Sequence, residues 1–355
     1  MSDDMKKIRK SPKTGMGSRQ DLLAAYVAQL HLIDKKPLSL TDIAKRLGVD
    51  KATVSRLLKR ARRDGILAYR LNLPRHEELE VRVRSLYDLN DVCIVPIPTP
   101  VGVPEKRFTY RLLGQAAAQY MERTGLIKSG VTIGLGCGTT VRETVLAIGS
   151  GKFDNLKILQ LLLEAGSDLY IDETPAGLVA VLSSKCQTTS FGFAIQPLPH
   201  SLEHEGGAYH QDYQEYRNKM LGWARAYDTT IVDIGSPDVT LVSSFGRVCT
   251  KSSVSEKDLH NLGIVGEICN RPFDKEGRDM FEEINRNFPL LSRFTDGIDL
   301  NELREMIRRG CRVVAVAGGG DKHEAIYFAL KNRLATHIVT DLYTAEALCE
   351  WGQPR

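Results

Sequence analysis

A glycine- and threonine-rich segment directly follows an apolar run and precedes a helical pattern. It reads Gly136, Cys137, Gly138, Thr139 and Thr140. Glycines let the backbone approach an anion, and the start of the following helix would supply N–H groups and the positive end of its dipole. The segment therefore suits one phosphate, although a tight turn with a capping threonine would explain the same residues. Its spacing matches neither the dinucleotide-binding fingerprint nor the Walker loop.

A second glycine-rich segment places a lysine at the start of a helix. Gly318, Gly319 and Gly320 follow an apolar strand pattern, and Lys322 comes two residues later. A cation in this position would pair with a phosphate or with polar sugar oxygens. The alternative is a solvated surface lysine.

Two further groups of polar residues invite a functional interpretation. Glu267 stands in a glycine-flanked stretch, where we expect a turn whose carboxylate accepts hydrogen bonds from sugar hydroxyls; a loop carboxylate in water is the alternative. Histidines and carboxylates also crowd residues 200–210, but their spacing matches no metal-binding pattern. We therefore expect neither a metal nor a cofactor.

A third set of side chains carries the chemistry that duplex DNA requires. Cations bind phosphates, and arginine or hydroxyl groups read base edges in the major groove. Such groups occupy the outward positions of one predicted helix, at Lys51, Thr53, Ser55, Arg56, Lys59 and Arg60. We expect the first four to face the major groove. The phosphate backbone would be contacted by Arg60, Arg62 and Arg63.

Two helices and a tight turn position these side chains. Ser39 would cap the first helix, Gly48 would end it, and Asp50 would cap the second. Apolar residues recur at helical spacing on the inner faces, at Ile43, Ala44, Leu47, Val54, Leu57, Leu58 and Ala61. This is the pattern of a helix-turn-helix, and a preceding helix over Asp21–Ile33 would complete its core. A basic helix in an ordinary helical hairpin is the alternative.

Beyond Asp91, apolar strands alternate with amphipathic helices. The predicted strands are Val92–Val95, Val131–Leu135, Leu156–Leu163, Thr189–Ile195, Thr229–Ile234, Val313–Val316 and His337–Val339. The predicted helices are Tyr110–Glu122, Thr140–Ile148, Pro175–Ser184, Tyr209–Ala226, Lys322–Leu330 and Tyr343–Glu350. Such alternation predicts an α/β domain with a mostly parallel sheet and helices on both faces.

The charge distribution supports a division into domains. The net charge is +4, but residues 1–75 hold 18 Lys and Arg against 7 Asp and Glu, whereas the remaining 280 hold 30 against 37. A basic end on an acidic body indicates a polyanion-binding module attached to another function. We expect a disordered basic arm over 1–18, a helix-turn-helix domain over 19–73 with a wing strand at Ile66–Leu71, a connector helix within 74–90 that would help to pair two subunits, and an α/β domain over 91–355.

Composition also limits the location of the chain. No apolar run is long enough to span a bilayer, and no signal-peptide core follows the N-terminus. The seven cysteines are scattered without a Cys-x-x-Cys pair, which is typical of reduced thiols in a cytoplasmic protein.

Taken together, both halves of the chain resemble the SorC-type family of bacterial, sugar-responsive transcription regulators. The resemblance runs from about Arg19 to Glu350. The blocks that carry it are Thr41–Val49 with Thr53–Arg56, Gly134–Val141, Gly263–Cys269, and Val316–Ile326 through Thr340 and Asp341. The resemblance implies a C-terminal domain similar to the sugar-phosphate isomerase and CoA-transferase-like fold, which binds a phosphorylated sugar and forms oligomers, typically tetramers.

By this resemblance, Gly138, Thr139 and Thr140 would hold the phosphate, and Glu267 and Lys322 the sugar oxygens. The sequence departs from the family pattern in two places. The family commonly has aspartate at the position of Glu267, and the histidine-containing segment 197–210 is unusual.

We therefore expect a regulator that binds duplex operator DNA as a homo-oligomer, a dimer or tetramer, under the control of a small phosphorylated sugar. One alternative is a sugar-phosphate isomerase-like enzyme with an appended DNA-binding module, although no acid/base pair stands near the phosphate loop. Another is a DNA scaffold protein without a small ligand.

Overall fold

The computed structural model describes residues 19–33, 36–63, 75–97, 106–164, 174–188, 215, 218–219, 222–223, 225–237, 244–289 and 295–353. The chain forms two compact units, Met1–Asn72 and Leu73–Arg355. Among the described residues, no helix is both long enough and apolar enough to cross a membrane. All seven cysteines are buried free thiols, as the sequence predicts.

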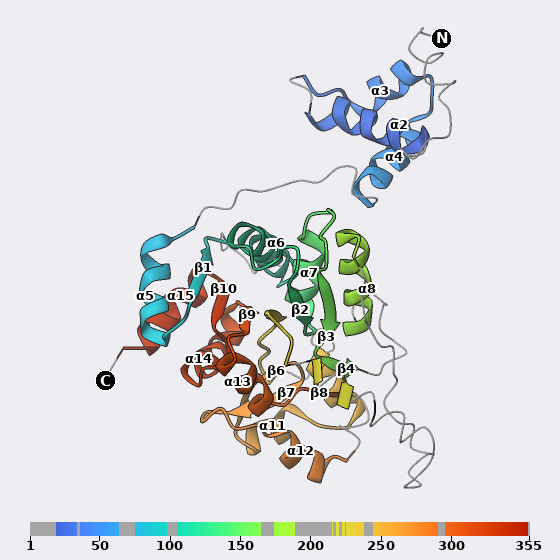
Figure 1. Cartoon of the computed structure of the whole chain (residues 1–355). Helices are drawn as coiled ribbons and strands as arrows, with labels where there is room; N and C mark the ends of the chain where they lie inside the picture. Colours follow the sequence, from blue (N-terminus) through green and yellow to red (C-terminus); the bar gives the residue numbers. More distant parts are fainter. Residues whose placement is uncertain are drawn as a thin grey trace. The chain divides into compact units, whose positions relative to one another are not determined.

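The described residues of the first unit form three α-helices (Figure 1). Helix α2 spans Arg19–Ala28 and continues as a π-helical turn over Gln29–Ile33, α3 spans Leu40–Leu47, and α4 spans Lys51–Arg63. Their shared core consists of Ala24, Val27, Ala28, Leu30, Ile43, Ala44, Leu47, Val54, Leu58 and Ala61. The predicted three-helix core is confirmed, although the apolar Leu22 of α2 is exposed.

The turn between α3 and α4 has the predicted capping residues. The Asp42 N–H donates to Ser39 Oγ at 3.2 Å, and the Thr53 N–H donates to Asp50 Oδ1 at 2.7 Å. Gly48 ends α3 with a φ of 64°, in the left-handed region that glycine adopts at little cost. The helix-turn-helix is therefore specified locally, by residues at its own helix ends.

Six parallel strands form the centre of the second unit, in the order β1-β10-β9-β5-β2-β3. Their bounds are β1 Asp91–Val95, β2 Thr132–Leu135, β3 Lys157–Gln160, β5 Thr229–Val232, β9 Arg312–Val316 and β10 His337–Asp341. The predicted parallel sheet is confirmed. Because helices cover both faces, the strands are apolar runs rather than alternating patterns.

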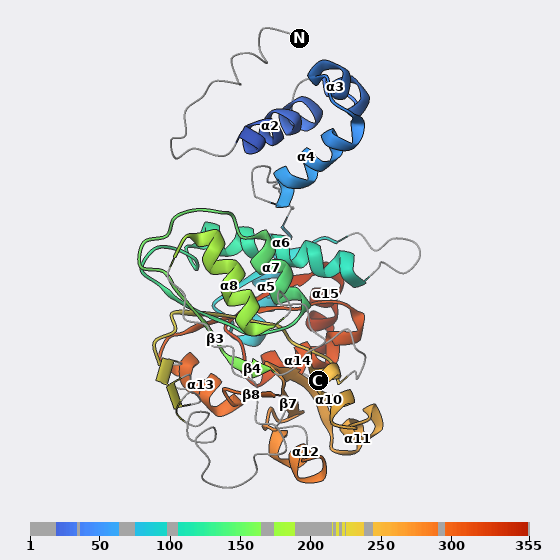
Figure 2. The ribbon, with the colours of Figure 1, turned by 90° about the vertical axis from the view of Figure 1, so that its right-hand side faces the viewer.

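Two sets of helices cover the sheet (Figure 2). The helices α6 Lys106–Thr124, α7 Thr139–Ala147 and α8 Pro175–Cys186 share one core with the strand residues Ile133 and Val314. A second core joins Ala315 and Ile338 to the helices α5 Glu77–Tyr87, α13 Leu300–Arg308, α14 His323–Lys331 and α15 Leu342–Trp351. The neighbours Val314 and Ala315 thus point to opposite faces, as the period of a strand requires.

Helix α5, predicted as a connector, packs against this body. Val83 and Tyr87 are buried, and the Tyr87 hydroxyl donates to the Leu348 carbonyl at 2.7 Å. The buried Glu80 carboxylate accepts from Arg75 at 2.6 Å and from the Ile94 N–H at 2.8 Å. Glu80 thereby pairs a backbone donor on β1, the edge strand of the sheet.

A module between β5 and β9 was not predicted from the sequence. It contains α10 Ser244–Lys251, α11 Glu256–Asn261, β6 Ile264–Ile268, β7 Arg271–Asp274, α12 Phe281–Asn287 and β8 Thr295–Gly297. The prediction of a single strand over Leu156–Leu163 was wrong. It divides into β3 and β4, Leu162–Glu164, and β4 pairs antiparallel with β8 outside the main sheet.

Several predicted features lie outside the described residues. They are the basic arm over 1–18, the wing strand Ile66–Leu71, the strand Thr189–Ile195, the histidine-containing loop 200–210 and most of the helix Tyr209–Ala226.

Candidate functional site

The carboxyl ends of four neighbouring strands bring the predicted ligand-binding segments together. These strands lie in the order β10-β9-β5-β2. Strand β10 ends at Asp341, and β9, β5 and β2 are followed by Ala317, Asp233 and Gly136. Ligands in open parallel sheets bind at such edges, beside a change in strand order. Segments more than 200 residues apart in the sequence thus share one edge.

The loop after β2 leads into α7 through Gly138, whose φ is 109°. No side chain caps this helix, so its first N–H groups are not bonded by a capping residue. Thr139 is half-buried, whereas Thr140 is fully buried and its hydroxyl donates to the Val316 carbonyl, on the strand β9. The Thr140 hydroxyl, expected at a phosphate, therefore joins the start of α7 to the end of β9 instead.

Lys322 is buried at the end of a short 3-10 turn, Gly320–Lys322, and is not a solvated surface lysine. Its Nζ lies 2.9 Å from Asp233 Oδ1 and 5.3 Å from the centre of the Tyr110 ring. Burial alone would lower the pKa of Lys322, but the Asp233 carboxylate and the Tyr110 and Glu267 side chains outweigh it and raise the pKa. The ammonium is therefore charged at neutral pH.

Asp233 links the two predicted segments, and the sequence reasoning missed it. It follows β5 directly, and burial raises its pKa although Lys322 opposes that shift. A Cβ atom on Gly138 would lie 2.6 Å from Asp233 Oδ2, so only glycine fits beside this carboxylate. The sequence feature that could have indicated Asp233 is a single carboxylate directly after an apolar strand.

Glu267 lies on strand β6 rather than in the predicted turn, and it is buried rather than a solvated loop carboxylate. Its backbone forms a bridge with Gly235, with hydrogen bonds of 3.0 and 2.9 Å in the two directions. Its Oε2 accepts the Asn270 N–H at 2.9 Å. A Cβ on Gly235 would fall 2.0 Å from Oε1, so this carboxylate packs directly on backbone.

The turn between β6 and β7 supports Glu267 and contacts the glycine-rich loop that follows β2. Cys269 and Asn270 have φ values of 53° and 59°, which fits a tight hairpin turn of the type I′ kind. Cys137 Sγ lies 3.7 Å from Asn270 Oδ1, and Asn270 Nδ2 donates to Thr295 Oγ1 at 3.2 Å. No turn dipeptide of the usual asparagine-glycine kind marked this hairpin in the sequence.

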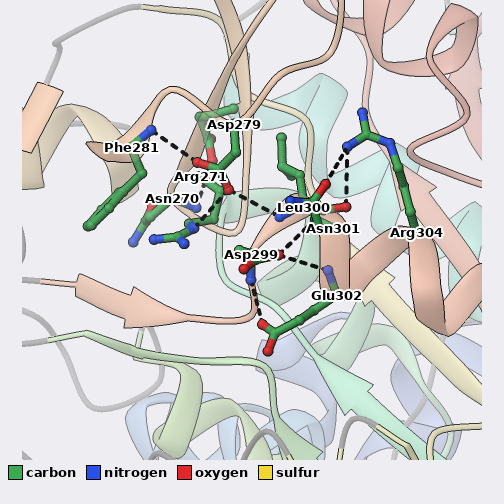
Figure 3. A network of polar contacts seen from close by, with 10 residues as sticks. Asn270, Arg271, Asp279, Phe281, Asp299, Leu300, Asn301, Glu302 and Arg304 are labelled. Carbon is green, nitrogen blue, oxygen red and sulfur yellow. Dashed lines mark hydrogen bonds and ion pairs between the residues drawn. The ribbon is translucent and has the colours of Figure 1, made fainter. Parts of the chain in front are cut away.

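A polar network holds the turn end of this hairpin (Figure 3). Arg271 Nε donates to Asp279 Oδ2 at 3.2 Å, and the Arg271 guanidinium lies 4.2 Å from the centre of the Phe281 ring. Asp279 also accepts the N–H groups of Phe281 and Leu300, at 3.0 and 3.1 Å. The hairpin is thereby tied to the start of α13.

Gly318 and Gly319 lie against the end of β10. The Gly319 N–H donates to Asp341 Oδ2 at 2.8 Å and approaches Thr344 Oγ1 at 3.1 Å. A Cβ on Gly318 would lie 2.1 Å from the same Asp341 oxygen. Because Gly318 has no side chain, the backbone of this loop can lie directly against Asp341, which caps α15. The sequence did not reveal this role.

The predicted DNA-contacting side chains on α4 differ in solvent exposure and in the hydrogen bonds that they form within the protein. Lys51, Arg56 and Lys59 are exposed, whereas Thr53 and Ser55 are half-buried. The Thr53 hydroxyl donates to Asp50 Oδ2 at 2.7 Å and accepts from Arg56 Nη2 at 2.8 Å.

Arg60, expected to contact a DNA phosphate, is half-buried and forms an ion pair with Asp21 of α2 at 2.8 Å. Its guanidinium therefore also holds α4 to α2. Arg62 and Arg63 belong to α4, but their side chains lie outside the described residues.

Comparison with known families decides between a transcription regulator and an enzyme. The Sugar-bind family model, a sugar-binding domain, matches residues 72–350. A MarR family model matches residues 20–72, the helix-turn-helix unit. The chain belongs to the SorC-type family of bacterial transcription regulators. It is therefore a DNA-binding regulator with a sugar-binding domain, and the enzyme alternative is not supported.

Relatives match over nearly their whole length. The transcriptional regulator LsrR of Enterobacter sp. (strain 638) is 26% identical over 348 residues, 97% of this chain and 98% of that protein. The deoxyribonucleoside regulator of Bacillus subtilis (strain 168) is 26% identical over 94% of this chain and 99% of its own. The erythritol catabolism regulatory protein EryD of Brucella abortus (strain 2308) is also 26% identical, over 96% and 99%.

The fold agrees with a solved member of this family. The full-length sorbitol operon regulator SorC from Klebsiella pneumoniae superposes with a TM-score of 0.61 at 22% identity, covering 94% of this chain and 100% of that one. At this identity the likeness establishes the shared fold.

Proposed function

We propose that this regulator controls a carbohydrate catabolism operon and that a small phosphorylated sugar sets its affinity for operator DNA. The observation that carries the proposal is the meeting of two glycine-rich loops around the Asp233–Lys322 pair, where Lys322 Nζ and Asp233 Oδ1 lie 2.9 Å apart. An uncapped helix start on one side and a buried cation on the other suit a ligand with an anionic and a hydroxyl-rich end.

We assign the phosphate to Gly136, Gly138, Thr139 and Thr140. Because the Thr140 hydroxyl is engaged with Val316, this residue would contribute its backbone N–H rather than its side chain. The sugar oxygens fall to Glu267 and Lys322, with the Gly318–Gly319 backbone beside them. Named relatives that regulate erythritol catabolism and a sorbitol operon support a polyol or sugar as the ligand class.

In the first unit, Lys51, Thr53, Ser55 and Arg56 would face the major groove, and Lys59 and Arg60 the phosphate backbone. Binding two half-sites of an operator requires paired heads, so the chain would act as a homo-oligomer, a dimer or tetramer, in the cytoplasm. The effector would bind one arrangement of the oligomer more tightly and so change the operator affinity.

The test is a thermal-unfolding screen of the full chain against phosphorylated pentoses, hexoses and polyols, with the unphosphorylated compounds as controls. At least one phosphorylated compound should raise the unfolding temperature, while its unphosphorylated form should not, because ligand binding to the folded state stabilises it. A screen in which no compound acts, or in which the unphosphorylated forms act equally, would contradict the proposal.

A further inference from the structure

The charges around Lys322 bear on which phosphorylated sugars the site accepts. The side chains of Lys322 and Asp233 are only 9% and 12% exposed, and their charged atoms lie 2.9 Å apart. Glu267, on a different strand, acts on the same ammonium. The charge of Lys322 is therefore matched by carboxylates of the protein itself.

Asp233 also borders the loop to which the phosphate is assigned. A Cβ on Gly138 would lie 2.6 Å from Asp233 Oδ2, so this carboxylate lies directly against the backbone of the loop. One phosphate at the start of α7 would thus already have a carboxylate as a neighbour. A second anionic group on the ligand would add another negative charge to a buried site whose lysine is already paired.

Lys322 nevertheless keeps donor capacity for an uncharged ligand. An ammonium has three N–H donors, and one of them is directed at Asp233. The remaining donors suit hydroxyl or ring oxygens, and the Glu267 carboxylate nearby suits hydroxyl donors. The pair therefore favours a polyol chain over a carboxylate or a second phosphate.

We propose that Asp233, by pairing with Lys322, is a specificity-determining residue that restricts the effector to a sugar or polyol with a single phosphate and an uncharged remainder. This inference rests on the proposed function and names the ligand class of the same site.

Calorimetry on the wild-type full chain tests the inference with matched ligand pairs. Glucitol 6-phosphate is compared with 6-phosphogluconate, and fructose 6-phosphate with fructose 1,6-bisphosphate. In each pair whose first member binds, we expect that member, which has one anionic group, to bind at least about tenfold more tightly than the member with two. This comparison needs no variant and so does not depend on the folding of one.

The variant Asp233→Asn tests the residue itself. It removes the negative charge of Asp233 with little change of shape, so the preference for the ligand with one anionic group should shrink about tenfold. The matched control is Glu324→Gln, which removes one negative charge from an exposed position of α14, where Glu324 lies 3.6 Å from Lys275. The control should leave the preference unchanged.

The outcomes separate this inference from the proposed function. If ligands with two anionic groups bind as tightly as their partners in the wild type, or if Asp233→Asn leaves the preference intact, the inference is overturned while the proposed function stands. If no phosphorylated compound binds and an unphosphorylated one does, the phosphate assignment fails first and this inference fails with it.

Discussion

At the scale of single residues, the site depends on a buried ion pair of which the sequence revealed only one half. Lys322 stood out because it follows three glycines, whereas Asp233 follows an ordinary apolar strand. The fold supplies the partner, since β5 and β9 are neighbours in the sheet and their ends adjoin. Residue types alone could not give this pairing because the two positions are 89 residues apart.

Breaking this pair should destabilise the second unit. Lys322→Met leaves the buried Asp233 carboxylate without its cation, which should cost about 3–5 kcal/mol in the free energy of unfolding. Denaturant unfolding measures this loss, and Lys257→Met, at an exposed position of α11, is the control. The double variant Lys322→Met/Asp233→Asn should recover a large part of the loss; a double variant no better than the single one would contradict the coupling.

Gly138 should tolerate no side chain. In Gly138→Ala the new Cβ meets Asp233 Oδ2 at 2.6 Å, so both stability and phosphosugar affinity should fall. Gly130→Ala is the matched control, because Gly130 also has a positive φ, 81°, but a Cβ added there would meet no atom within 4 Å. The control should lose about 1–2 kcal/mol of stability from backbone strain and keep its ligand affinity. Equal ligand affinity in both variants would argue against the role of this loop.

A buried histidine should make the second unit sensitive to acid. Burial lowers the pKa of His337 from 6.5 to about 4, since the charged ring is poorly solvated between β1 and β9. The unfolded chain therefore binds this proton first, and stability falls as the pH drops from 6.5 towards 4, by about 3 kcal/mol in all.

Unfolding free energies of His337→Asn and wild type, measured between pH 7 and pH 4, check this sign. The variant should lose the part of the acid slope due to His337, whereas His260→Asn, at an exposed position of α11, should not. An unchanged slope in His337→Asn would show that other groups cause the acid sensitivity.

At the scale of elements, the sequence predicted those helices and strands that capping residues and apolar spacing within the segment determine. The capping residues Ser39, Gly48 and Asp50 and the helical apolar spacing gave the helix-turn-helix, and apolar runs gave the strands of the main sheet. The module of residues 244–297 was not predicted, because its helices and strands are short, with three to eight residues each. Its hairpin turn places Cys269, which has no preference for positive φ, beside Asn270, and so lacks the usual asparagine-glycine signal.

The same distinction applies to the candidate site. The glycine-rich loops and Lys322 were predictable from their positions after apolar runs. The engagement of the Thr140 hydroxyl with Val316 and the pairing of Arg60 with Asp21 were not, because both partners come from other elements. Helix α4 thus presents fewer free side chains to DNA than its sequence indicates.

The exposed residues of α4 should divide into two roles. Arg56→Ala should weaken operator binding by about 1–3 kcal/mol and reduce discrimination against altered operators, because an arginine at a base edge reads sequence. Lys59→Ala should weaken binding to all duplexes alike. It should also reduce the slope of log affinity against log salt concentration by about one, because one phosphate contact is lost.

Fluorescence anisotropy with operator and scrambled duplexes at several salt concentrations separates these effects. Arg286→Ala, at the exposed Arg286 of α12 in the second unit, serves as the control. Wild-type affinity and selectivity in Arg56→Ala would show that this face of α4 does not read the groove.

At the scale of the whole molecule, the chain divides two tasks between two units of opposite charge. The first 75 residues are strongly basic and the remainder is acidic. A basic unit binds a polyanion and an acidic body does not compete for it, so non-specific DNA binding is confined to one end. The acidic body instead holds Lys322 in a buried position, where we propose that it binds a small ligand.

The most direct test of the account is the affinity of a stabilising phosphosugar, measured by calorimetry with and without saturating operator DNA. If the two sites are linked, the two affinities should differ by about fivefold or more, and operator affinity should change by the same factor when the sugar is present. Identical sugar affinities in the presence and absence of operator would contradict the account.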